Sequence, residues 1–179
     1  IANIHRHPKP VKVTMKGSFH GRTDNPAKVS NSCLQGYKKH LQRFNDKLPV
    51  YSIKMNDIKE AEKTFKKIKE NGEFPEITLI EPVQGEGNPG VAMSPEFYKV
   101  LRKLTKEACG LLLSDSIQAG WRCCGELSIM NYPGFSELEP PDMETYSKSI
   151  NAGQYPLSVL ALSKNLTDNF RPGLYGNTM

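Results

Sequence analysis

Between residues 50 and 115 the chain alternates short apolar segments with two longer segments whose apolar residues recur at helical spacing. The expected strands are 50–53, 77–83 and 110–115, and the expected helices are 58–71 and 94–109. Strands that alternate with helices form parallel sheets, because the chain must cross over the sheet between parallel strands. The alternation therefore predicts an α/β fold, with a mostly parallel sheet and helices on both faces.

Both expected helices begin at recognisable capping residues. Asp57 precedes the first helix, whose apolar residues fall on one face before Asn71 and Gly72 end it. Ser94 precedes the second helix, with Pro95 at the first helical position. Further strands are expected at 11–15, 143–147 and 156–162, whereas 24–48 shows turn signals and no element that we can assign.

Several polar or aromatic residues lie where the expected strands end. They are Phe19, Glu81, Glu86, Asp115 and Lys148. In open parallel sheets, ligands bind beyond the carboxyl ends of the strands. The sequence therefore predicts a binding site along this edge of the sheet.

The composition is that of an ordinary globular protein of 179 residues, with 37% hydrophobic and 24% charged residues. The net charge is +5, but the sequence shows neither a basic stripe nor the exposed aromatic residues that nucleic-acid binding requires. We therefore expect no nucleic-acid partner. No segment is long and apolar enough for a membrane span, and no secretory signal is visible.

The four cysteines, Cys33, Cys109, Cys123 and Cys124, include no C-x-x-C pair, so we expect no metal site. Four cysteines in a chain of this size are too few for a disulfide framework. We therefore expect a reducing, intracellular compartment, either the cytoplasm or an organelle such as the mitochondrion.

The pair of Asp115 and Lys148 suits pyridoxal phosphate chemistry. A lysine amine can form an imine with the cofactor aldehyde, and an aspartate can keep the pyridine nitrogen protonated so that the ring accepts electrons. Asp115 ends the apolar strand, and Lys148 lies in a loop of small residues further on. Neither residue alone would justify this interpretation.

Five segments in order resemble the class III, pyridoxal-phosphate-dependent aminotransferases, a family that includes ornithine, acetylornithine and 4-aminobutyrate aminotransferases. They are S-F-H-G-R-T at 18–23, E-P-V-Q-G-E-G at 81–87, L-L-L-S-D-S-I-Q-A-G at 111–120, P-D-M-E-T-Y-S-K-S-I-N-A-G at 141–153 and G-N-T at 176–178. The resemblance implies part of a fold type I large domain and pyridoxal 5'-phosphate as cofactor.

The resemblance also assigns roles. Lys148 matches the lysine that forms the Schiff base and moves the proton, and Asp115 matches the partner of the pyridine nitrogen. For the cofactor ring, the family pattern places Phe19 and Ile117 on opposite faces and Gln118 near the hydroxyl. The remaining matches are His20 as a support beside the cofactor, Thr178 at the phosphate of a neighbouring subunit, and Glu81 and Glu86 beside the substrate.

The chain departs from the family pattern in three respects. The usual D-E-[IV]-Q-T-G is here D-S-I-Q-A-G, so that Ser116 replaces a glutamate, and Cys123 stands where an arginine is expected. The family's N-terminal phosphate-loop segment and its C-terminal small domain are absent. We therefore expect residues 1–179 to be an incomplete cofactor-binding large domain, stable only with other chain segments.

The resulting expectation is an aminotransferase that moves an amino group from an amino acid, with an omega-amino donor such as ornithine as the candidate, to a 2-oxo acid. It would act as a homodimer or larger oligomer, with the missing segments on other chains. Two alternatives stay open. One is an inactive aminotransferase-like fragment serving as a structural subunit of a larger assembly, and the other is an aminomutase, decarboxylase or racemase with the same lysine and aspartate.

Overall fold

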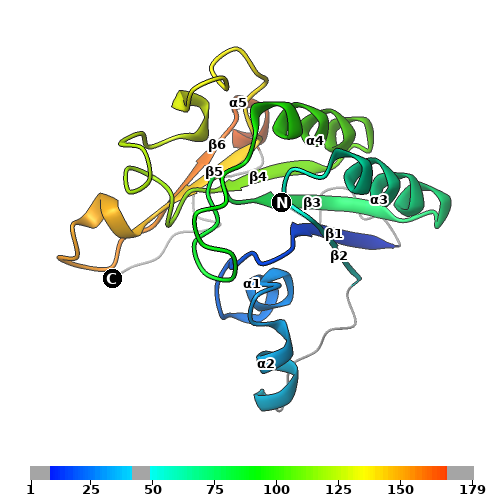
Figure 1. Cartoon of the computed structure of the whole chain (residues 1–179), viewed down its shortest axis with the longest axis horizontal. Coiled ribbons are helices and arrows are strands. Elements are labelled where there is room, and N and C mark those ends of the chain that lie inside the picture. The colour runs from blue at the N-terminus through cyan, green and yellow to red at the C-terminus, as the bar shows by residue number, and fades with distance from the viewer. Residues whose placement is uncertain (1–8, 42–48, 169–179) are drawn as a thin grey trace.

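A six-stranded sheet forms the centre of the computed structural model, which describes residues 9–41 and 49–168 (Figure 1). The order of the strands across the sheet is β2-β1-β3-β4-β5-β6. All neighbouring strands run parallel except β5 and β6, which are antiparallel. This confirms the predicted α/β fold with a mostly parallel sheet. The strands are β1 Pro10–Met15, β2 Val50–Ile53, β3 Phe74–Ile80, β4 Leu111–Asp115, β5 Met143–Tyr146 and β6 Val159–Leu162.

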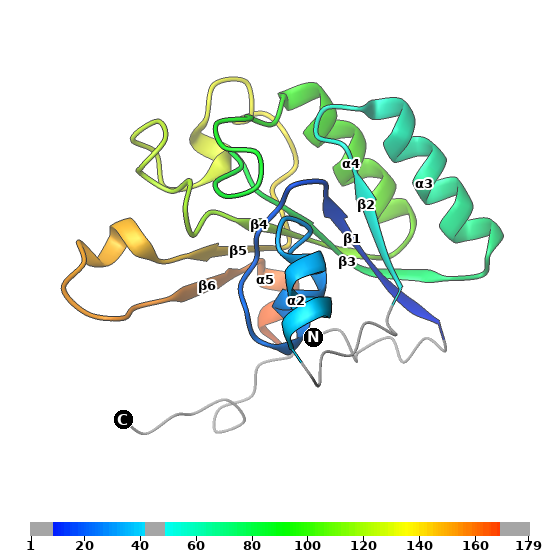
Figure 2. The same cartoon turned by 60° about the horizontal axis from the view of Figure 1, so that its bottom comes forward.

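Helices lie on both faces of the sheet, as predicted. On one face α3 (Ile58–Glu70) and α4 (Pro95–Glu107) pack side by side, and on the other α1 (Asp24–Val29) contacts β1 and is followed by α2 (Leu34–His40) (Figure 2). A last short helix, α5 (Lys164–Thr167), follows β6. The sequence analysis missed α1 and α2, because neither carries apolar residues at helical spacing.

Both predicted caps are confirmed. The Asp57 side chain accepts a hydrogen bond from the Glu60 backbone N–H at 2.9 Å, and Ser94 Oγ accepts one from Phe97 N–H at 3.2 Å. Each helix begins at the residue after its cap, and it buries its apolar face against the sheet. Within residues 9–41 and 49–168 we find no helix with the length and apolarity needed to cross a bilayer.

Strand β3 begins and ends three residues earlier than the sequence predicted. Its first residues, Phe74 and Pro75, pair with Pro10 and Val11 of β1, where the register is irregular. The strand ends at Ile80 because Glu81 turns away and Pro82 has no N–H to donate to a neighbouring strand. Glu81 therefore belongs to the loop beyond the sheet and not to the strand itself.

Candidate functional site

The residues singled out in the sequence lie along one edge of the sheet. The parallel strands β1, β3, β4 and β5 end at this edge, and the loops that follow them carry His20, Glu81, Gln118 and Lys148. Asp115 is the last residue of β4. This confirms the prediction that these residues follow neighbouring strand ends, the place where ligands bind in open parallel sheets.

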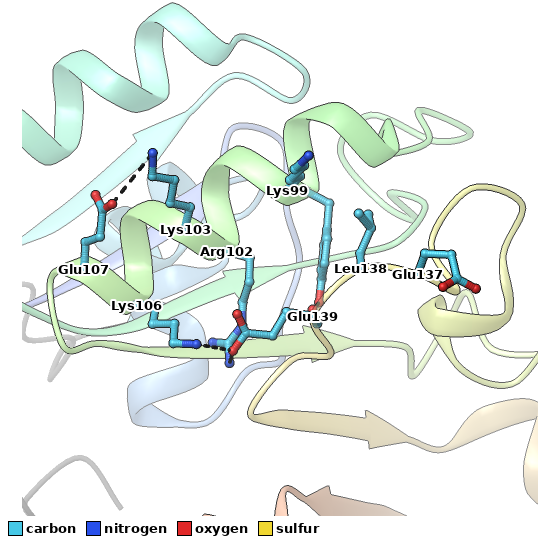
Figure 3. A pocket seen from close by; sticks show the side chains of 9 residues that line it. Lys99, Arg102, Lys103, Lys106, Glu107, Glu137, Leu138 and Glu139 are labelled. Carbon is cyan, nitrogen blue, oxygen red and sulfur yellow. Dashed lines mark hydrogen bonds and ion pairs between the residues drawn. The ribbon is translucent and has the colours of Figure 1, made fainter.

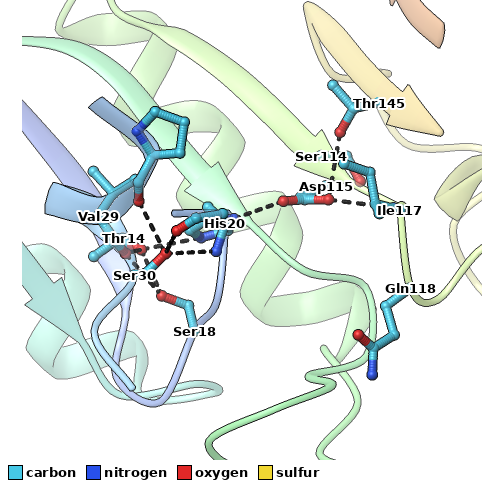
Figure 4. A network of polar contacts seen from close by, with 12 residues as sticks. Thr14, Ser18, His20, Val29, Ser30, Ser114, Asp115, Ile117, Gln118 and Thr145 are labelled. Carbon is cyan, nitrogen blue, oxygen red and sulfur yellow. Dashed lines mark hydrogen bonds and ion pairs between the residues drawn. The ribbon is translucent and has the colours of Figure 1, made fainter. Parts of the chain in front are cut away.

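Asp115 is buried and has three hydrogen-bond partners. Its Oδ2 lies 2.8 Å from Nδ1 of His20, while Oδ1 accepts hydrogen bonds from Ile117 N–H at 3.2 Å and Thr145 Oγ1 at 3.4 Å (Figure 4). Because an ionised carboxylate only accepts hydrogen bonds, Nδ1 of His20 must carry the proton. The contact therefore fixes both the orientation of the carboxylate and the ring nitrogen that faces it.

His20 is held on its other side by hydroxyl groups. Its Nε2 lies 3.2 Å from Thr14 Oγ1, which in turn lies 2.8 Å from Ser18 Oγ. The His20 backbone N–H donates to Ser30 Oγ at 2.9 Å. The side chain is only 2% exposed. The sequence interpretation treated His20 as a support, and the structure shows that it supports Asp115 directly.

Lys148 lies two residues after the end of β5, at the start of a 3₁₀ turn, Lys148–Asn151. Its φ of +45° falls in the left-handed region, where residues other than glycine are rare and strained. Its Nζ donates a hydrogen bond to Oε1 of Gln118. Ser149 Oγ donates to the carbonyl of Gly120 at 2.5 Å, which ties the turn to the loop after Asp115. The structure therefore brings Lys148 and Gln118 together.

The two glutamates of the loop after β3 differ in environment. Glu81 is buried, and burial raises its pKa to about 7, although the charge of His20 and the N–H groups of Phe19 and Gly85 act to lower it. Its Oε2 has no hydrogen-bond partner among the described residues. Glu86, by contrast, is exposed. Only Glu86 is therefore freely accessible to a ligand from solvent.

A cavity of about 240 Å³ opens beside Asp115 on the face of the sheet that carries α1. His20, Asp115 and Ile117 border it, and apolar residues of the sheet such as Leu79 and Leu113 form its floor. Phe19 is half-buried, next to His20 in the same loop. The remaining predicted residue, Thr178, lies outside the described residues.

A second cavity, of about 430 Å³, lies between α4 and residues 137–139 and shares no lining residue with the first (Figure 3). Arg102 and Lys106 both form ion pairs with Glu139 there, at 3.1 and 2.8 Å. Binding sites normally present polar groups that converge on the ligand. Because these charges pair with each other, we place the candidate site at Asp115 and Lys148.

The sequence analysis did not single out Glu144, although it is central to the polar structure under the site. This glutamate of β5 is buried and accepts hydrogen bonds from Ser116 Oγ at 2.5 Å, Ser128 Oγ at 2.6 Å and Ile129 N–H at 3.0 Å. In the segment M-E-T-Y a glutamate is expected to point to solvent. These three donors come from distant parts of the chain, so the local pattern did not identify Glu144.

Solved structures of aminotransferases share this fold. The ornithine aminotransferase of Toxoplasma gondii superposes with a TM-score of 0.75 at 25% identity, over 99% of this chain and 39% of that protein. A transaminase from the marine bacterium Virgibacillus gives a TM-score of 0.76 at 18% identity, over 94% of this chain and 38% of that protein. The described sheet and helices therefore form part of an aminotransferase fold.

Curated relatives give the same picture from sequence. Ornithine aminotransferase 2 of Staphylococcus aureus is 31% identical over 93% of this chain, and acetylornithine aminotransferase of a Nostoc strain is 31% identical over 95%. The chain spans 38% and 37% of the length of these two relatives. The model of the protein family described as "Aminotransferase class-III" matches residues 3–179 of this chain. The chain therefore belongs to the class III aminotransferases, a pyridoxal-phosphate-dependent family.

Proposed function

We propose that the protein is a pyridoxal-phosphate-dependent aminotransferase that moves an amino group from an amino acid to a 2-oxo acid. The observation that carries this proposal is the arrangement of Lys148 beside Gln118 and of Asp115 beside His20, at neighbouring strand ends. Relatives named ornithine and acetylornithine aminotransferases support the same reaction class.

The environment of Asp115 suits the pyridine nitrogen of the cofactor. The two hydrogen bonds to Oδ1 are long, at 3.2 and 3.4 Å, and a carboxylate oxygen can accept a further, shorter one. The buried negative charge would favour a protonated ring nitrogen. Gln118, whose amide reaches the Lys148 amine, would contact the ring hydroxyl, and Phe19 and Ile117 would flank the ring.

The cofactor, when bound, supplies an electron sink for the substrate carbon that loses its proton. The chain's own residues would then act as follows. Lys148 would hold the cofactor through its amine and afterwards carry the proton to and from the reacting carbon. His20 would keep Asp115 oriented through the 2.8 Å contact.

The exposed carboxylate of Glu86 supports a donor with a second, positively charged amino group. Such a group would pair with a carboxylate at the rim of the site. An omega-amino donor such as ornithine has this chemistry. We therefore propose ornithine-type amino acids as the donor class, and a kcat/KM comparison of ornithine with norvaline would test this choice.

The test of the proposed function is the absorption spectrum of the purified protein before and after borohydride reduction, followed by peptide mapping. We expect a yellow protein that loses its colour on reduction, with a pyridoxyl group fixed on Lys148. Lys148→Arg should abolish the labelling, and Lys164→Arg, which changes an exposed lysine, should not. A protein that stays unlabelled with added pyridoxal phosphate would instead support a structural subunit without catalysis.

We propose in addition that residues 1–179 are part of a larger cofactor-binding domain and that the assembly is at least a homodimer. Large apolar side chains at Trp121, Tyr155 and Leu160 are exposed by 48%, 64% and 43%, which is typical of surfaces that other segments or subunits cover. The molar mass in solution, from light scattering, would test the dimer. A monomer at micromolar concentration would contradict it.

A further inference from the structure

The carboxylate of Glu144 connects three separate parts of the chain beneath the candidate site. It lies on β5 and accepts hydrogen bonds from Ser116 after β4, from Ser128, and from Ile129, which begins a further 3₁₀ element, Ile129–Asn131. A buried carboxylate is stable only if hydrogen bonds compensate for its lost hydration. Here Ser116, 1% exposed, and Glu144, 5% exposed, provide such a compensated pair.

Glu144 also lies next to both structural elements that hold Asp115. Ser116 directly follows Asp115 and precedes Ile117, whose N–H donates to Asp115 Oδ1. Thr145 directly follows Glu144 and donates to the same oxygen from β5 (Figure 4). The hydrogen bond between Ser116 and Glu144 therefore links the residues that adjoin these two donors, beside the backbone hydrogen bond from Ser116 N–H to the Thr145 carbonyl at 3.0 Å.

The position of Glu144 bears on the departure of this chain from the family motif at Ser116. The family pattern D-E-[IV]-Q places a glutamate at the position of Ser116, whereas in this chain the nearby acid comes from β5. Acids at both positions would place two carboxylates in one buried site, and one of them would have to take up a proton. We therefore expect the buried site to hold a single negative charge.

We propose that Glu144 is a positioning residue for Asp115, and that positions 116 and 144 form one buried site that accepts a carboxylate from either position but not from both. The importance of orienting Asp115 rests on the proposed function. The structural claim does not, because it concerns hydrogen bonds and charge within the chain itself.

The test is an exchange of the two residues in the purified protein. We compare Ser116→Glu, Glu144→Ser and the double variant S116E/E144S, which keeps composition, net charge and approximate volume. Ser116→Gln separates the added volume from the added charge. Ser136→Glu and Glu137→Ser, alone and together, make the same exchange at exposed neighbours and serve as the matched control.

The first measurement is the thermal midpoint at about pH 5 and about pH 8. We expect Ser116→Glu to lose about 5–10 °C more at the higher pH, because the shared proton becomes harder to retain, and Ser116→Gln to show no such pH dependence. The double variant should recover most of the loss, and the controls should change by less than about 2 °C. A double variant no better than the sum of the single variants would overturn the proposal.

The second measurement is the low-field proton resonance of His20 Nδ1–H, which reports the contact with Asp115. We expect it to shift or broaden in folded Glu144→Ser, or in Glu144→Gln if the serine variant does not fold, and to return in the double variant. An unchanged resonance in a folded but destabilised variant would show that Glu144 has a purely structural role and does not position Asp115. Neither measurement uses turnover, so both remain valid if the protein proves not to be an aminotransferase.

Discussion

The guanidinium of Arg102 forms two parallel hydrogen bonds with the carboxylate of Asp142, from Nη1 to Oδ2 at 2.6 Å and from Nη2 to Oδ1 at 3.0 Å. Arg102 belongs to α4, and Asp142 directly precedes β5. Asp142 Oδ2 also accepts a hydrogen bond from Leu112 N–H of β4 at 2.8 Å. A single ion pair therefore attaches the outer helix to two strands of the sheet.

Replacing Arg102 with methionine should lower the free energy of unfolding by about 3 kcal/mol, because it leaves the largely buried Asp142 carboxylate without its cation. Urea titration at neutral pH measures this change. Lys103→Met is the matched control, since Lys103 is exposed and its contact with Glu107 is long, at 3.8 Å. The control should change stability by less than about 0.5 kcal/mol. Equal effects of the two substitutions would contradict this role of Arg102.

Glu81 should make the stability of the protein fall as the pH rises from about 4.5 to about 7. Burial raises its pKa in the folded state to about 7, so the folded state binds more protons than the unfolded state in this range. The free energy of unfolding should fall by about 3 kcal/mol in total, and the full loss is reached above the folded-state pKa.

Glu81→Gln should remove this pH dependence, and it should raise the stability at about pH 8 relative to the unsubstituted protein. Urea unfolding at several pH values between about 5 and 8 would measure both effects. Glu86→Gln serves as the control because Glu86 is exposed in the same loop. A Glu81→Gln profile parallel to that of the original protein would show that Glu81 titrates normally.

Gly110→Ala should destabilise the protein strongly. An added Cβ at this position would lie 2.2 Å from the carbonyl oxygen of Pro75, so the start of β4 could not stay beside β3. We expect a loss of about 3 kcal/mol in the free energy of unfolding. Gly36→Ala is the control, because nothing lies within 4 Å of its Cβ position. A Gly110→Ala protein with an unchanged melting temperature would disprove the close approach.

Gly85→Ala should change the site without unfolding the protein. The new Cβ would lie 2.5 Å from the amide group of Gln118, and this flexible side chain can move away, which breaks its contact with Lys148. On the proposed function we expect kcat to fall about tenfold, as for the loss of one hydrogen bond, while the melting temperature stays within about 3 °C. A normal kcat would mean that Gln118 does not need to contact Lys148.

The sequence predicted most of the fold because the elements on the α3 and α4 face have strong local signals. Asp57 and Ser94 cap helices with clear apolar faces, and the strand before Asp115 is almost continuously apolar. Helices α1 and α2 have no such signal, and they are stabilised by contacts such as the one from Thr14 to the Val29 carbonyl at 3.1 Å. Such contacts join residues far apart in the sequence and leave no periodic pattern.

The candidate site was likewise predicted only in part from the sequence. The ends of the strands predicted where Asp115 and Lys148 would lie, and the family resemblance supplied Gln118. The hydrogen bonds of Glu144 and the burial of Glu81 depend on how loops from different strands meet. The local sequence gives no sign that either side chain points inward, so only the folded structure reveals these orientations.

The contact between His20 and Asp115 joins residues 95 positions apart and spans two strands that are not neighbours, because β3 lies between β1 and β4. The contact can form only after three strands have assembled in register, and closing so long a loop is slow. A ligand can therefore occupy the site only in protein chains whose strands have completed this assembly. A small molecule held at Asp115 would favour the finished sheet over every partly assembled intermediate and thereby act as a folding ligand for the chain.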